Sequence, residues 1–149
     1  MQPFRFSLDR VLAWRRTQLG LEEARFRQEM AAMAGIDRLR AEAEAAGVKA
    51  EMNVRGWRTV TGAELAALGE FRRAIQARKA EIAARRVRQV QKIAAQEAAL
   101  MEARRRCRLL ERLKEKRAGE WRSASDRELE EVASESYLAQ WTRRATPNS

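Results

Sequence analysis

The chain has 149 residues and a formal net charge of +10, with 35% charged and only 6% aromatic side chains. Its bias toward Ala, Arg, Glu, Leu and Lys is typical of a long helix or coiled coil and not of a compact globule. The sequence has no histidine, a single cysteine and no phosphate-binding or nucleophile motif. We therefore expect a protein without catalytic activity, metal or cofactor.

The amino-terminal residues lack the apolar core of a signal peptide, and no stretch approaches about 20 apolar residues. Cys107 stands alone, so an internal disulfide is impossible. These features predict a cytoplasmic protein that does not insert into a membrane, although it can dock peripherally at the cytoplasmic face of one.

The first predicted helix covers residues 7–55, with Ser7 as its N-cap, because the two prolines of the chain, Pro3 and Pro147, leave all positions between them free to be helical. Leucine, phenylalanine and methionine recur there at three-, four- and seven-residue steps. Arg15 and Glu22 interrupt this seam. Glycines at 20, 35 and 47 each weaken the helix by about 1 kcal/mol relative to alanine, so this helix needs a partner.

A turn is predicted at residues 56–61, where Thr61 and Glu64 form a capping-box pattern that starts the second helix. That helix covers residues 62–141, and residues 142–149 form a frayed tail. Its apolar positions drift between heptad and eleven-residue spacing, which favours irregular supercoiling.

The fold class expected is all-α: a single domain, residues 1–149, built as a long antiparallel two-helix coiled-coil hairpin whose second helix is the longer. In such a hairpin residue i lies opposite residue 116 − i. The second helix then projects beyond its partner after Leu110, unless this projecting part folds back or another protein covers it.

Charge is segregated along the second helix. Residues 72–117 hold 16 Lys and Arg against 5 Asp and Glu, whereas residues 118–141 hold 2 against 6. The basic stretch can bind an acidic protein surface or nucleic acid, or it can be a solvated helix with no partner. Aromatic residues gather at both chain ends, where they either pack on one another or form an exposed binding surface.

Two end segments resemble a known family. Phe4-Arg5-Phe6-Ser7-Leu8-Asp9-Arg10-Val11-Leu12-Ala13-Trp14-Arg15-Arg16 resembles the opening of the FliJ family. Residues 109–117, Leu-Leu-Glu-Arg-Leu-Lys-Glu-Lys-Arg, followed by Glu120-Trp121, are similar to its C-terminal signature. The resemblance covers about residues 4–141.

Members of that family are non-enzymatic cytoplasmic components of the bacterial flagellar type III export apparatus, similar to the stalk of rotary ATPases. The resemblance implies three partners: the hexameric export ATPase, the cytoplasmic domain of the export gate membrane protein, and export chaperones. The expected ATPase-facing residues are Phe4, Leu8, Arg10, Leu12, Arg16, Leu110, Arg112, Leu113, Lys116, Arg117 and Trp121. The expected gate-facing residues, beside the turn, are Leu39, Ala43, Leu68, Phe71 and Ile75.

Three alternatives remain open. The first is the equivalent stalk protein of a virulence injectisome, which sequence barely distinguishes from the flagellar component. The second is a basic coiled-coil protein that binds nucleic acid, although no recognition module or aromatic stacking platform is visible and we expect no such partner. The third is a structural coiled coil that dimerises through its projecting segment.

Overall fold

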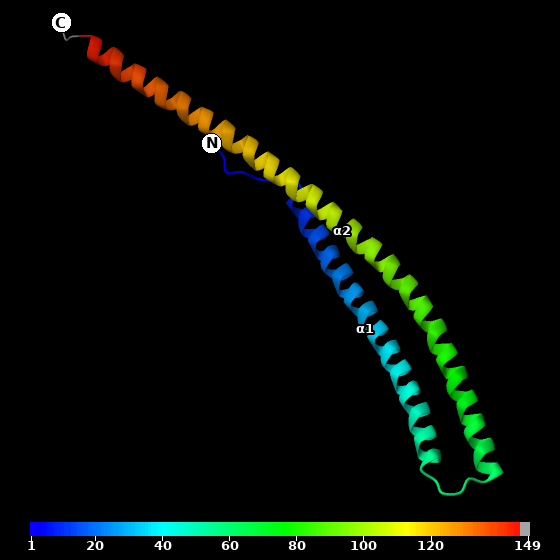
Figure 1. Cartoon of the computed structure of the whole chain (residues 1–149). Helices are drawn as coiled ribbons and strands as arrows, with labels where there is room; N and C mark the ends of the chain where they lie inside the picture. The colour runs from blue at the N-terminus through cyan, green and yellow to red at the C-terminus, as the bar shows by residue number, and fades with distance from the viewer. Residues whose placement is uncertain (147–149) are drawn as a thin grey trace. The chain divides into compact units, whose positions relative to one another are not determined.

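The computed structural model describes residues 1–146 and consists of two α-helices that pack against each other (Figure 1). Helix α1 runs from Asp9–Arg55 and helix α2 from Gly62–Ala145, with 47 and 84 residues respectively. The described residues contain no strand. The prediction of an all-α hairpin with a longer second helix is confirmed.

Both outer helix ends differ from the prediction. Leu8 is the first residue whose carbonyl accepts a helical hydrogen bond, from the Leu12 amide at 2.9 Å, so Ser7 lies in the preceding turn and is not the N-cap. At the other end α2 continues through residues 142–145, which were expected to fray. Nothing in that stretch breaks a helix, and its last turn carries two arginines that suit the negative end of the helix dipole. The rest of the expected tail, residues 147–149, lies outside the described residues.

The turn between the helices occupies residues 56–61, as predicted. The Glu64 amide donates to the Thr61 hydroxyl, and the Thr61 amide donates to a Glu64 carboxylate oxygen, each at 3.2 Å. This reciprocal capping box satisfies two backbone donors that the first turn of α2 would otherwise leave unpaired. The Gly56 amide closes the end of α1 by donating to the Met52 carbonyl at 3.2 Å.

The chain divides into two compact units. The turn unit comprises residues 19–103, and the terminal unit comprises residues 1–18 together with residues from 104 onward. Each contains an antiparallel segment of α1 and α2 and is described by itself below.

The turn unit has a small apolar core in which Ile36 and Ala43 of α1 meet Ile82 of α2, with Leu39 packed against them. Ile36 and Ala43 are one heptad apart, which is the spacing of a coiled-coil seam. Helix α1 is continuous through its glycines. At Gly47 an added Cβ would lie 3.6 Å from Ile75, an ordinary contact distance, so the helices pass closely there.

Two polar layers interrupt this apolar seam, one heptad apart. Gln89 is only 6% exposed, and its side-chain amide donates to the Glu29 carbonyl oxygen at 2.9 Å and to the Glu29 carboxylate at 2.5 Å. Gln96 donates in the same way to the carbonyl and carboxylate of Glu22. Glu22 therefore occupies a seam position and completes a layer, where the sequence pattern suggested a break. The rule that residue i lies opposite residue 116 − i places position 87 opposite Glu29, so the observed contact with Gln89 differs from the expected register by two residues.

Candidate interaction surface of the terminal unit

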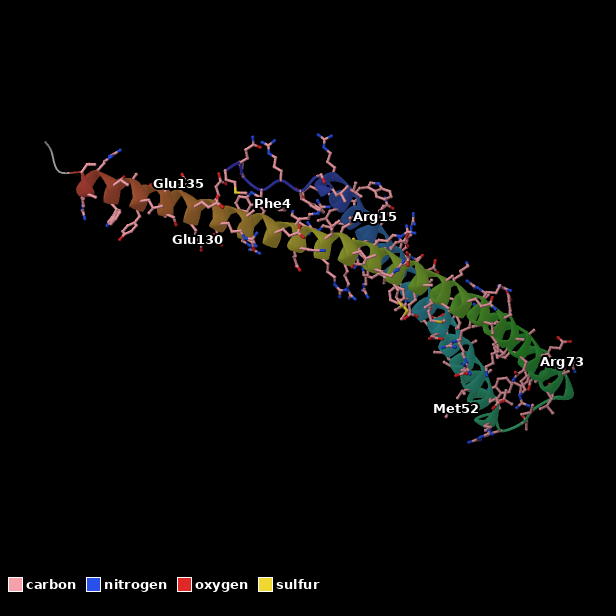
Figure 2. The ribbon with its side chains drawn as sticks, turned by 90° about the horizontal axis from the view of Figure 1, so that it is seen from above. Phe4, Arg15, Met52, Arg73, Glu130 and Glu135 are labelled. Atoms are coloured by element: carbon pink, nitrogen blue, oxygen red, sulfur yellow. The ribbon has the colours of Figure 1, made fainter. Side chains whose placement is uncertain are left out.

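The first residues of the chain lie along α2 in the terminal unit (Figure 2). The Trp121 indole N–H donates to the Gln2 carbonyl oxygen at 3.1 Å. The Phe4 ring lies 6.2 Å from the Trp121 ring, centroid to centroid, at an interplanar angle of 48°. Phe6 is buried. The N-terminal segment thus packs onto α2, so aromatic residues from the two chain ends contact one another, one of the two arrangements that the sequence left open for them.

The extended conformation of this segment explains its reach. Residues 1–6 have no helical structure. An extended chain rises about 3.3 Å per residue and a helix about 1.5 Å, so six extended residues can cover roughly thirteen residues of α2. This coverage accounts for the contact of Gln2 with Trp121, seven residues beyond position 114, which the hairpin arithmetic places opposite Gln2.

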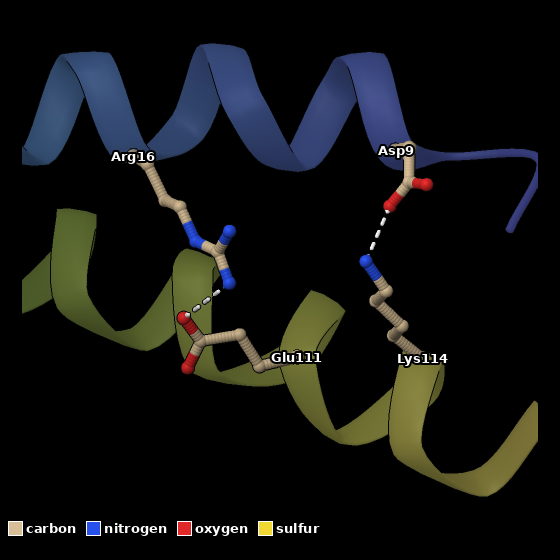
Figure 3. Close-up of polar contacts among 4 residues, drawn as sticks. All are labelled: Asp9, Arg16, Glu111 and Lys114. Carbon is tan, nitrogen blue, oxygen red and sulfur yellow. Dashed lines mark hydrogen bonds and ion pairs between the residues drawn. The ribbon is translucent and has the colours of Figure 1, made fainter. Parts of the chain in front are cut away.

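Two ion pairs join α1 to α2 beside this segment (Figure 3). Lys114 Nζ lies 2.8 Å from Asp9 Oδ1, and Arg16 Nη2 lies 3.4 Å from Glu111 Oε1. All four side chains are well exposed, so each pair stabilises the fold by at most about 1 kcal/mol. Their larger effect is that two cations, Arg16 and Lys114, and the carboxylates paired with them are no longer free to bind a partner protein.

Below these pairs lies a small buried core. Leu12 is 1% exposed, and Cys107 is also buried. Burial, and secondarily the charge of Glu111, raises the pKa of the Cys107 thiol, although Arg16 and Arg15 partly oppose the shift. Leu12 was expected to face the ATPase, but its burial makes it a residue that holds the two helices together.

The other expected ATPase-facing residues fall into two groups. Apolar members are half-buried where the helices and the N-terminal segment meet: Phe4, Leu8, Leu110, Leu113 and Trp121. Basic members are exposed: Arg10, Arg16, Arg112, Lys116 and Arg117. Arg112 and Lys116 are four residues apart and therefore share one face of α2.

Leu109 and Trp14, two of the exposed apolar residues of this unit, were not among the expected ATPase-facing residues. Leu109 is 53% exposed on α2, three residues before Arg112. Trp14 is exposed on α1, where the Arg15 guanidinium carbon lies 4.7 Å above its ring. Leu109 lies between the seam positions 107 and 110. This offset from the heptad pattern is the sequence feature that could have predicted its exposure. Trp14 was counted with the aromatic chain end, but its exposure could not be read from the sequence.

The expected gate-facing residues, all in the turn unit, divide in a similar way. Ala43 belongs to the buried core, so its side chain is not available to a partner, and the half-buried Leu39 packs against that core. Ile75 is half-buried beside Gly47. Leu68 and Phe71 instead line an apolar hollow of about 300 Å³ near the turn.

Trp57 also lines this hollow. It is 49% exposed. Large apolar side chains that remain half-exposed around a hollow are frequent anchors in protein interfaces. Trp57, Leu68 and Phe71 are therefore the best-placed residues of the turn unit for contacting a partner.

Within residues 1–146, neither helix combines the length and the apolar character that a membrane span requires, and no group of three or more His, Cys, Asp or Glu side chains could hold a metal ion. No protein-family model, curated protein or solved structure matches the chain.

Proposed function

We propose that this chain is a non-enzymatic, stalk-like component of the bacterial flagellar type III export apparatus. In this role the terminal unit contacts the hexameric export ATPase and promotes its assembly. The turn unit contacts the cytoplasmic domain of the export gate, and export chaperones are further partners. The chain would act in the cytoplasm, at the inner face of the membrane when the apparatus is assembled.

One observation carries the proposal. The two segments that resemble the FliJ family, residues 4–16 and 109–121, are about a hundred positions apart in the sequence yet lie side by side in the terminal unit. Phe4 meets Trp121, and Asp9 meets Lys114. The antiparallel hairpin brings these positions together, so the two signatures form one continuous surface, as a single binding site requires.

The chemistry of this surface favours an acidic protein partner. Arg112 and Lys116 present two cations on one face of α2, with the exposed Leu109 beside them. Cations around an apolar anchor suit acidic loops that carry an apolar residue. Such loops lining the central hole of an ATPase ring would hold the terminal unit in a defined orientation.

The test is stimulation of the purified export ATPase encoded by the same genome. The double charge reversal Arg112→Glu and Lys116→Glu should abolish stimulation while the helical circular-dichroism signal is unchanged. The matched control is Arg73→Glu with Arg78→Glu, two exposed cations of the turn unit, which should stimulate as the unaltered chain does. Full stimulation by the first variant would refute the assignment of this surface.

A second measurement addresses the nucleic-acid alternative. Binding to phosphates would be independent of nucleotide sequence and would weaken steeply as salt is raised, because each neutralised phosphate releases a counterion. A protein that binds the ATPase tightly at physiological salt, but binds duplex DNA or RNA only at low salt, supports the export role. The reverse order of affinities would support the nucleic-acid role.

A further inference from the structure

The end of α2 has no partner within the described chain. We call residues 122–145 the overhang: all of them are exposed except Ser125, which is half-buried. No other segment runs beside this part of α2, where Glu130 and Glu135 point into solvent (Figures 1 and 2). Leu138 and Trp141 are 59% and 61% exposed. A single helix of this length is marginal in water, because most helical stability in proteins comes from packing an apolar face.

The charges of α2 indicate what could cover the overhang. Residues 104–117 hold eight Lys and Arg against two Glu, whereas residues 126–135 of the overhang hold five acidic residues against one basic one. Opposite charges therefore occupy separate stretches of one helix. A second copy of the same helix, laid antiparallel, would place each acidic stretch against a basic one.

The outer face of α2, turned away from α1, has the apolar and charged positions that such pairing needs. Steps of three, four and seven residues connect Leu109 and Lys116 with Glu130, Leu138 and Trp141 on this face, and all five side chains are exposed. The buried position 107 and the half-buried positions 110, 114 and 121 lie on the opposite side, where α1 and the N-terminal segment pack.

We propose that two copies of this chain associate antiparallel through this outer face, so that the overhang of each lies along residues 104–117 of the other. In the register that best matches charge, Arg112 faces the partner copy's residue 130, a glutamate, and Lys116 faces residue 126, an aspartate. Two-fold symmetry makes each of these pairs twice. The exposed apolar side chains on the same face are then covered.

Charge also favours this offset over the simpler arrangement in which the two overhangs pair with each other about their centres. That register would place Glu130 opposite the partner copy's residue 137, a tyrosine, and Glu131 opposite residue 136, a serine. It would therefore form none of the opposite-charge pairs that the offset register makes.

The experiment is a charge swap on the full chain, followed by sedimentation velocity over a concentration series at low and physiological salt. The unaltered chain should dimerise, more weakly as salt rises. Arg112→Glu alone and Glu130→Arg alone should each weaken dimerisation by about tenfold or more, because two attractive pairs become repulsive. An equimolar mixture of the two variants should dimerise again, since both pairs are restored in the mixed dimer.

Recovery of dimerisation in the mixture excludes misfolding as the cause of its loss in the single variants. The control variant is Arg122→Glu, which reverses an exposed charge away from the outer face and should dimerise normally. Any one of three results would overturn the proposal. The unaltered chain could stay monomeric at about 100 µM in low salt, the single variants could dimerise normally, or the mixture of the two variants could fail to dimerise. The proposal does not depend on the export role, but the dimer covers the Arg112 and Lys116 face that the ATPase contact would use, so the two associations exclude one another on that face. Glu130→Arg leaves Arg112 and Lys116 in place, so loss of dimerisation with normal ATPase stimulation separates the two questions.

Discussion

The side-chain amide of Gln89 on α2 donates two hydrogen bonds to Glu29 on α1, one to its carbonyl oxygen and one to its carboxylate. A buried amide that reaches a backbone carbonyl on the facing helix defines which residues lie opposite one another. Buried polar residues at coiled-coil seam positions commonly specify register at some cost in stability. A matching layer one heptad away, Gln96 on Glu22, reinforces that specification.

Replacing Gln89 by leucine should destabilise the hairpin by about 1–3 kcal/mol, because the half-buried Glu29 carboxylate loses its donor. The double replacement Glu29→Leu with Gln89→Leu should recover most of that loss. A double-mutant cycle from urea unfolding measures the coupling. Equal destabilisation by the single and double replacements would show that the hydrogen bonds do not matter.

Replacing Gly35 by alanine should stabilise the protein by about 0.5–1 kcal/mol, since no atom lies within 4 Å of the added Cβ and alanine loses less entropy in a helix. Gly20→Ala meets the same open space and serves as a replicate. The urea midpoint should rise with an unchanged slope. A lower midpoint would mean that α1 needs a glycine at this position.

Replacing Trp121 by alanine should release the N-terminal segment, because the contacts to Gln2 and Phe4 both end on this indole. Losing about 1 kcal/mol of ring contact and hydrogen bond increases the open population about fivefold. Trypsin cleavage after Arg5, followed by mass spectrometry, should accelerate accordingly. Trp57→Ala in the turn unit is the control and should leave this cleavage rate unchanged.

Cys107 should react slowly with iodoacetamide at neutral pH, because its thiol is buried and its pKa is raised. The matched control is Leu109→Cys in a Cys107→Ser background, which places an exposed thiol two residues away and should react much faster. Fast alkylation of Cys107 in the folded chain would contradict the burial of this position.

The same shift predicts a pH dependence of stability. A raised thiol pKa means that folding favours the neutral form, so its contribution is fully present at neutral pH. That contribution is lost as the pH rises above the pKa of the unfolded chain and through that of the folded chain. The stability difference between the unaltered chain and Cys107→Ala should therefore be smaller at about pH 10 than at pH 7. An equal difference at both pH values would exclude this linkage.

The sequence alone was sufficient for the features that depend on a few neighbouring residues. The capping box at Thr61 and Glu64, the turn, the inner helix ends and the continuous helical stretches follow from local propensity and local hydrogen bonds. The charge segregation along α2 is likewise a property of the sequence itself. Only the tertiary structure decided which partners meet across the hairpin.

That difference has a physical reason. Whether Glu22 breaks a seam or completes a layer depends on Gln96, which is 74 positions away. The packing of the N-terminal segment on Trp121 depends on an extended conformation, which leaves no helical periodicity in the sequence from which it could be predicted. Register and coverage arise from pairwise contacts between distant residues, so the spacing within either helix does not contain them.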